Sequence, residues 1–304
     1  MSESRDLAIK REDGGPGRSI TYEHAIHLRI LQALDDVQNS DMIQRWNVPI
    51  CHGFLRAQDA DAWALILPRL PPGYTRCNAL ISERIPPISA KVRQLLTDRY
   101  CRGIVRKSAA VDVMNDDCVI RAYLGRRRLC LSRPSRFRGF SLRNFTLHLD
   151  QMEEFGLDLC AYARAIGDAL AFLHWKACVD ARDVEFVLAP CRKGETAPFS
   201  VGQFGEHTIW VLDFDCCSPL ALDANGVDEA VKVFYRNDAF YPLPGRKHDT
   251  DRWQAFRDRY LEASREFVSE HDEALGVEKL PGLFIDRVVK QLHRSRNQPI
   301  GLIL

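Results

Sequence analysis

Residues 209–217 read Ile-Trp-Val-Leu-Asp-Phe-Asp-Cys-Cys, and this stretch decides the fold that we expect. Four apolar residues followed at once by acids are typical of a buried strand that ends at a polar edge. A shorter apolar run at 186–188 precedes it across a polar loop, so the two runs predict a hairpin. Upstream, apolar residues recur at steps of three and four, which predicts a helix from Glu153 to Trp175 with one buried face.

The rest of the chain offers shorter signals on both sides of this core. We expect a helix that opens near Ser19 or Thr21, another that begins near Lys91, and three late helices at 227–236, 251–269 and 283–294. Extended runs predict strands at 7–10, 48–55, 79–85 and 119–124.

The order of a long helix, an acidic loop and two strands resembles the protein-kinase-like fold. In that fold, a catalytic-loop aspartate is followed five positions later by a metal ligand, and a second aspartate follows a strand. Asp180, Glu185 and Asp213 have this spacing. Lys10 and Glu23 match the strand lysine and helix glutamate of the same fold, and we interpret them as an architectural ion pair.

This resemblance implies an α+β, two-lobed, degenerate kinase-like fold. Residues 1–90 would form a truncated, strand-rich N-terminal lobe, and residues 91–304 a mostly helical C-terminal lobe with an Arg-rich insertion at about 118–149. No Gly-rich loop precedes Lys10, and Cys178-Val179-Asp180 stands where His-Arg-Asp is usual. A kinase-like phosphotransferase or a pseudokinase is therefore the alternative function and not the leading one.

Whole phrases of the sequence are similar to a fungal family, once called hypothetical or zinc finger-like, that includes arginine-containing cyclodipeptide synthases. The resemblance covers about residues 80–265. The phrases are His174-Trp175, Asp183–Leu188, Trp210–Cys217, Phe234–Asp238 and Phe240–Pro242. The resemblance implies an enzyme of fungal secondary metabolism, a transferase or ligase that joins arginine from arginyl-tRNA to a second aminoacyl group. The product would be a cyclo(Arg-Xaa) diketopiperazine, and its partners would be arginyl-tRNA and a second aminoacyl-tRNA.

Carboxylates are the candidate catalytic groups, because a planar guanidinium is held best by acids in a two-pronged arrangement. We expect five of them to converge in one cleft that accepts a cation: Asp180, Asp183, Glu185, Asp213 and Asp215. Magnesium is the rival guest and would favour the kinase-like alternative. The other interpretation is that Asp180 and Asp183 cap turns and only one or two acids face the cleft.

Arginines supply a candidate surface for tRNA, although the net charge of the chain is only +1. No acid occurs between Asp117 and Asp150, so eight positive charges stand together with aromatic residues between them. The predicted tRNA-binding residues are Arg121, Arg126, Arg127, Arg128, Arg133, Arg136, Arg138 and Arg143. The alternatives are a basic face that neutralises acids elsewhere in the fold, or an RNA-binding adaptor that uses this segment without catalysis.

Cysteines and histidines give weaker signals. The ten cysteines lack regular spacing and read as free thiols, and Cys216 or Cys217 could act as a nucleophile, although inert burial is the simpler interpretation. His174 reads as a packed core residue. No Cys/His quartet has zinc spacing, so we expect neither metal nor cofactor.

The sequence has no run that predicts a membrane span or a secretory leader, which favours the cytoplasm, and it leaves the oligomeric state open.

Overall fold

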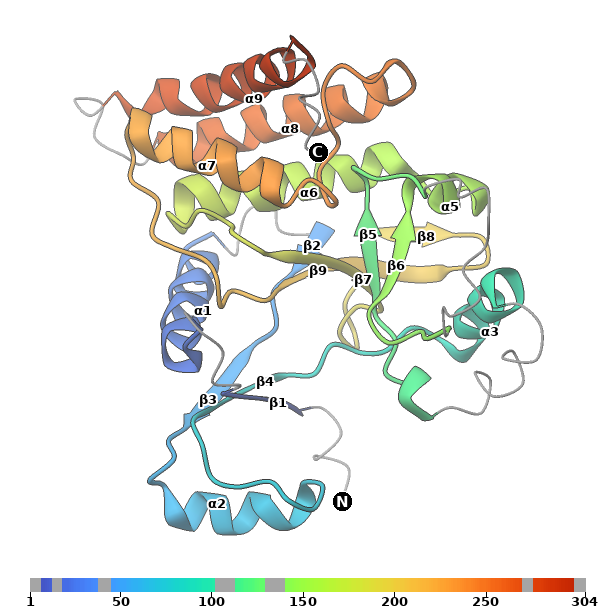
Figure 1. Cartoon of the computed structure of the whole chain (residues 1–304), viewed down its shortest axis with the longest axis vertical. Coiled ribbons are helices and arrows are strands. Elements are labelled where there is room, and N and C mark those ends of the chain that lie inside the picture. Colours follow the sequence, from blue (N-terminus) through green and yellow to red (C-terminus); the bar gives the residue numbers. More distant parts are fainter. Residues whose placement is uncertain are drawn as a thin grey trace, which may run out of the picture.

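The computed structural model describes residues 7–12, 18–37, 45–101, 113–128, 140–269 and 276–297. These residues form an α+β fold with two separate sheets (Figure 1). The class expected from the sequence is therefore confirmed. Among the described residues, no helix combines the length and the apolar composition that crossing a bilayer requires.

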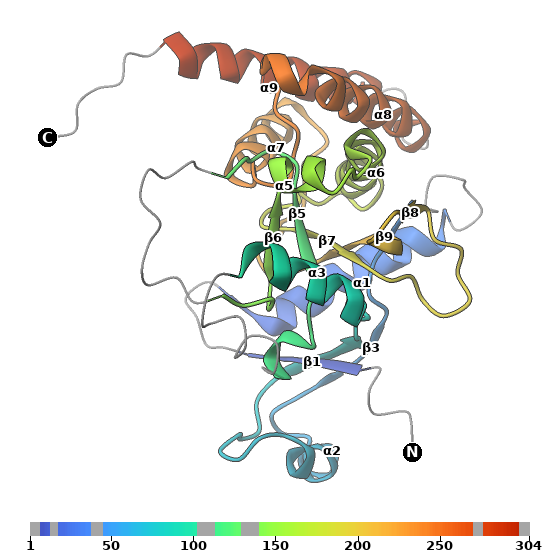
Figure 2. The same cartoon turned by 90° about the vertical axis from the view of Figure 1, so that its right-hand side faces the viewer.

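The smaller sheet is antiparallel, with strand order β1-β4-β3. Its strands are β1 (Leu7–Arg11), β3 (Cys51–Leu55) and β4 (Ala79–Glu83). Helix α1 (Ile20–Asp35) lies against β3 and β4. It begins where the Ser19 hydroxyl accepts a hydrogen bond from the backbone of Tyr22, and it buries Ile26 and Ile30. A short helix, α2 (Ala60–Ile66), lies at the far end of this sheet (Figure 2).

The larger sheet has the strand order β2-β9-β7-β5-β6, with β8 paired to β9. The two central strands, β7 (Glu185–Ala189) and β9 (Gly205–Leu212), pair antiparallel, so the predicted hairpin is confirmed. Their outer neighbours are β2 (Trp46–Asn47), β5 (Ile120–Tyr123), β6 (Phe145–His148) and β8 (Phe199–Val201).

Four helices stack on one side of the larger sheet: α6 (Leu159–Ala171), α7 (Ala224–Arg236), α8 (Thr250–Val268) and α9 (Leu280–Asn297) (Figures 1 and 2). Helix α6 continues into a π-helical turn, Phe172–Lys176. It packs tightly on α8 at Gly167, where a Cβ would lie 2.8 Å from the carbonyl oxygen of Phe256. Only glycine allows the two backbones to approach this closely.

The predicted helix from Glu153 to Trp175 was wrong at its start. Helix α5 (Leu149–Glu154) ends near Gly156, whose φ of 67° takes the chain out of the helical region. A new helix, α6, begins after Asp158, whose side chain accepts a hydrogen bond from the backbone of Ala161. Helix α3 (Ala90–Tyr100) and the three late helices formed within three residues of their predicted bounds. The short elements α2, β2, β6 and β8 were missed.

Candidate functional site

Three acids from two distant segments meet at Lys10. Its Nζ lies 2.9 Å from Oε1 of Glu23, 2.6 Å from Oδ1 of Asp213 and 3.7 Å from Oδ2 of Asp215. Burial opposes the charge on Lys10, but Asp213 and Glu23 outweigh it and raise the lysine pKa. Burial also raises the pKa of Glu23, against the influence of Lys10. The two residues interpreted from the sequence as an ion pair are therefore in contact, with Asp213 as a third member.

Secondary structure brings these groups together from both sheets. Lys10 lies in β1, beside β4, and Glu23 lies in the first turn of α1. Asp213 follows the last residue of β9 and has a φ of 68°, in the left-handed region. Three residues of the loop before β7 share that region: Cys178, Ala181 and Asp183. Such values are uncommon outside glycine, and a cluster of them often marks a loop that places functional side chains.

Arg18 supplies a second cation, which the sequence analysis missed. One of its Nη atoms lies 3.2 Å from Oδ2 of Asp215, and the other lies 3.9 Å from Oδ2 of Asp183. The Asp215 side chain is only 6% exposed, whereas that of Asp183 is 58% exposed. The guanidinium therefore spans from a buried acid to the solvent edge. The sequence gives little indication of this role for Arg18. Its only mark is that it directly precedes Ser19, the cap of α1.

Two buried carboxylate oxygens at this site have unused acceptor capacity. Oδ1 of Asp215 and Oε2 of Glu23 accept no hydrogen bond from the part of the chain that the structure describes. A buried acceptor without a donor is unfavourable by about 1–3 kcal/mol. The site can therefore accept further donors.

The other two predicted acids, Asp180 and Glu185, already have partners within the chain. Asp180 is buried, and its Oδ1 accepts hydrogen bonds from the backbone N–H groups of Arg182 and Ser218. Glu185 pairs through both carboxylate oxygens with Arg121, at 2.7 and 2.5 Å. Burial raises the pKa of each acid. The structure thus brings Asp183, Asp213 and Asp215 together and gives Asp180 and Glu185 separate partners.

The described arginines of the basic segment are mostly paired with acids from distant parts of the chain. Arg126 contacts Asp238, and Arg128 contacts Asp150. Arg127 contacts both Glu153 and Asp249. Arg121 pairs with Glu185, as stated above, and Arg143 is exposed. Arg133, Arg136 and Arg138 lie outside the described residues. These ion pairs are what the interpretation of a neutralising basic face expects.

The cysteines and His174 have surroundings that suit packing. The Cys217 thiol is buried and donates to the carbonyl oxygen of Arg182. Burial and the neighbouring Asp215 raise the pKa of Cys216 to about 11, so its thiol is protonated at neutral pH. His174 is buried, with its Nδ1 2.9 Å from the hydroxyl of Tyr260. A reactive cysteine would need a lowered pKa instead.

Comparison with known families found one match, to a family described as a zinc finger protein, over residues 209–272. This segment begins within β9, includes all of α7 and α8, and is less than a quarter of the chain. No curated protein and no solved structure matches the chain. The resemblance to the cyclodipeptide synthase family is corrected by this finding, because the matching family is described as a zinc finger protein. Three of the five stretches on which that resemblance rested lie in the matched segment: Trp210–Cys217, Phe234–Asp238 and Phe240–Pro242.

The residues do not fit a zinc finger. Such a site needs four cysteine or histidine ligands in a tetrahedron. Within the described ranges, the group that could hold a metal is Asp183, Asp215 and Cys216, whose ligand atoms lie within 4.8 Å of one another. Two of its three members are carboxylates, and Arg18 already contacts both. We therefore assign no role to zinc.

Proposed function

We propose that the acids around Arg18 bind the guanidinium of an arginine substrate, and that the chain joins arginine from arginyl-tRNA to a second aminoacyl group. The product is cyclo(Arg-Xaa). The observation that supports the proposal is the position of the Arg18 guanidinium, which lies between Asp215 and Asp183. It supports the proposal because a substrate arginine would make the same contacts. This contact supports the guanidinium site, and the reaction with arginyl-tRNA is the expectation drawn from the sequence.

The chemistry suits a site without bound nucleotide. An aminoacyl-tRNA is an activated ester, so its conversion to an amide is downhill. The amine of the second aminoacyl group attacks the arginyl ester carbonyl, the C–O bond breaks, and the tRNA hydroxyl leaves with the proton lost by the amine. The arginine amine then attacks the remaining ester and closes the ring, which releases the second tRNA. Lys10 and the acids around it would hold charges and protons at this centre.

We also propose that the two sheets belong to a two-lobed, kinase-like arrangement. The contact of Lys10 with Glu23 of α1 and with Asp213 after β9 supports it, because kinases use a strand lysine, a helix glutamate and such an aspartate. Phosphoryl transfer fits less well. In such a reaction Asp180 would serve as the base and Glu185 as a magnesium ligand. Backbone N–H groups already bind Asp180, and Arg121 already pairs with Glu185.

A kinase-like phosphotransferase or pseudokinase is the second candidate, favoured by the Lys10 contacts alone. A thermal shift scan with ATP, with and without magnesium, separates the two candidates. A ligand at 100 times its dissociation constant stabilises a protein by about 2.7 kcal/mol. Stabilisation by ATP that is lost in Lys10→Met would favour the second candidate.

The leading proposal is tested by incubating the chain with arginyl-tRNA and each other aminoacyl-tRNA, followed by mass spectrometry. We expect a cyclo(Arg-Xaa) product, and its loss in Asp215→Asn and Asp183→Asn. Asp228→Asn is the matched control, because Asp228 is an exposed partner of Arg287. The proposal fails if no arginine-containing diketopiperazine forms with any partner. It also fails if the two site variants are as active as the control.

A further inference from the structure

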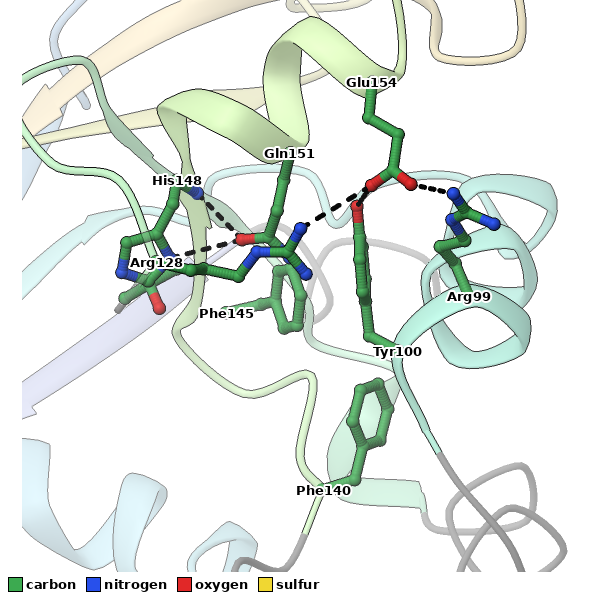
Figure 3. Close-up of a pocket in the computed structure, with 9 residues that line it drawn as sticks. Arg99, Tyr100, Arg128, Phe140, Phe145, His148, Gln151 and Glu154 are labelled. Atoms are coloured by element: carbon green, nitrogen blue, oxygen red, sulfur yellow. Dashed lines mark hydrogen bonds and ion pairs between the residues drawn. The ribbon is translucent and has the colours of Figure 1, made fainter. Parts of the chain in front are cut away.

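A pocket is lined mainly by residues of α3, β6 and α5, none of which belongs to the Lys10 site (Figure 3). Its volume is about 580 Å³, within the range of roughly 300–1,000 Å³ that is common for small-molecule sites. Three aromatic rings line it, from Tyr100, Phe140 and Phe145. The centroids of the Tyr100 and Phe140 rings lie 6.2 and 6.1 Å from that of Phe145. The lining therefore offers faces on which a planar ring can stack.

The same lining carries two guanidinium groups and one carboxylate, from Arg99, Arg128 and Glu154. Glu154 is a shared anchor: Arg99 bonds one of its oxygens, while the Tyr100 hydroxyl donates to the other at 2.8 Å. Arg128 lies 3.8 Å from that second oxygen, and its guanidinium carbon lies 5.1 Å from the centre of the Tyr100 ring (Figure 3). Glu154 thus contacts three side chains of the lining.

The pocket lining keeps hydrogen-bond donors that those contacts do not use. A guanidinium carries five N–H donors. Arg128 directs its Nε to Asp150 and one Nη toward Glu154, so its other donors are available among the described residues. His148 directs Nδ1 to the side-chain oxygen of Gln151 at 3.2 Å, which leaves Nε2 of the neutral ring as an acceptor. The wall can therefore hold an anion and also accept a hydrogen bond from a hydroxyl or an amine.

We propose that this pocket binds a nucleotide, either free or as the unpaired end of an RNA chain. The base stacks on Tyr100 and Phe145, the phosphate pairs with Arg128, and His148 accepts a hydrogen bond from the sugar or base. A nucleotide combines a planar ring, an anion and hydroxyl donors in one ligand, which matches the three kinds of group in the lining. This assignment is independent of the synthase reaction and of the acids around Arg18.

Isothermal titration of the full chain with 5′-AMP tests the assignment. Adenosine, inorganic phosphate and benzoate are the comparison ligands. We expect AMP to bind at least tenfold more tightly than each of them. The affinity for AMP should fall as salt is added, because salt screens the phosphate contact. A six-nucleotide single-stranded RNA distinguishes the sources: binding tighter than that of AMP points to an RNA end, and weaker binding points to a free nucleotide. Equal binding of AMP and benzoate would overturn the proposal, as would no AMP binding.

Variants localise the site. Arg128→Gln should weaken AMP binding at least tenfold, and Phe145→Leu should weaken it at least fivefold while it keeps an apolar side chain. Arg257→Gln is the control, because Arg257 forms an exposed pair with Asp258 on α8. Circular dichroism checks that each variant is folded. Thr146 also lines the pocket, so Thr146→Val is a milder change of the lining if Phe145→Leu does not fold. AMP affinity unchanged by the folded lining variants overturns the proposal. The measurement is binding, so a failed synthase assay leaves its result intact.

Discussion

Nζ of Lys10 lies 2.6 Å from Oδ1 of Asp213, although 203 positions separate the two residues in the chain. This contact joins the smaller sheet to the end of β9 in the larger sheet. Glu23 and Asp215 lie around the same ammonium group. The Lys10 ammonium group therefore balances part of the negative charge of these acids at the junction of the two sheets, and its removal has consequences that can be measured.

Lys10→Met should destabilise the fold, because it leaves Glu23 and Asp213 without their shared cation. The expected loss is about 1–3 kcal/mol, discounted for the partial exposure of the lysine side chain. Urea unfolding measures it. The control is Lys232→Met, which removes an exposed pair with Glu229 and should change the free energy of unfolding much less, because solvent screens that pair. Equal effects of the two substitutions would contradict the central role of Lys10.

Arg18→Ala should strengthen the binding of arginine methyl ester. The Arg18 guanidinium contacts Asp183 and Asp215, so a ligand with the same group must displace it. When a site is competent for only part of the time, the apparent affinity falls in proportion. We expect a severalfold lower dissociation constant in Arg18→Ala by calorimetry and no change in Arg257→Ala. A weaker ester affinity in Arg18→Ala would show that Arg18 assists binding instead of competing with it.

Alkylation of Cys216 should be slow at neutral pH and should accelerate as the pH rises toward 11. The thiolate is the reactive form, and burial together with Asp215 raises the pKa of this thiol to about 11. Mass spectrometry after iodoacetamide treatment at several pH values gives the rate at this site. The variant Asp215→Asn should shift the rate profile toward lower pH. Rapid alkylation at pH 7 would contradict the protonated thiol.

His174 should make the fold less stable in acid. Burial lowers the pKa of this histidine to about 3, whereas an unfolded chain has an ordinary value near 6.5. Between these values the unfolded state binds a proton that the folded state excludes, so stability is retained above pH 6.5 and falls as the pH decreases toward 3. The contribution approaches about 1.4 kcal/mol per pH unit.

Chemical denaturation at pH 7 and at pH 5 measures this loss. The variant His174→Gln should lose less stability between the two pH values than the unaltered chain does. An NMR titration is a second measurement, because it follows the imidazole ring directly and does not require the variant to fold. A His174 ring that is already protonated at pH 5.5 in the folded chain would contradict the prediction.

The sequence by itself determined the elements whose signal is local and periodic. The apolar spacing of α6 and the run that forms β9 could be read directly, because each element buries one face or the whole of a short segment. The junction of Lys10, Glu23 and Asp213 was found only through the order of motifs. The break at Gly156 was missed, because the apolar repeat of α6 was extended backward through it.

Only the tertiary structure decided which charges are compensated. No acid lies within the basic segment, yet Arg126, Arg127 and Arg128 contact acids from elsewhere in the chain: Asp150, Glu153, Asp238 and Asp249. In the same way, Glu185 is occupied by Arg121, and Asp215 by Arg18. Electrostatic energy depends on distance through the fold and not on separation along the chain, so residue order alone could not assign these partners.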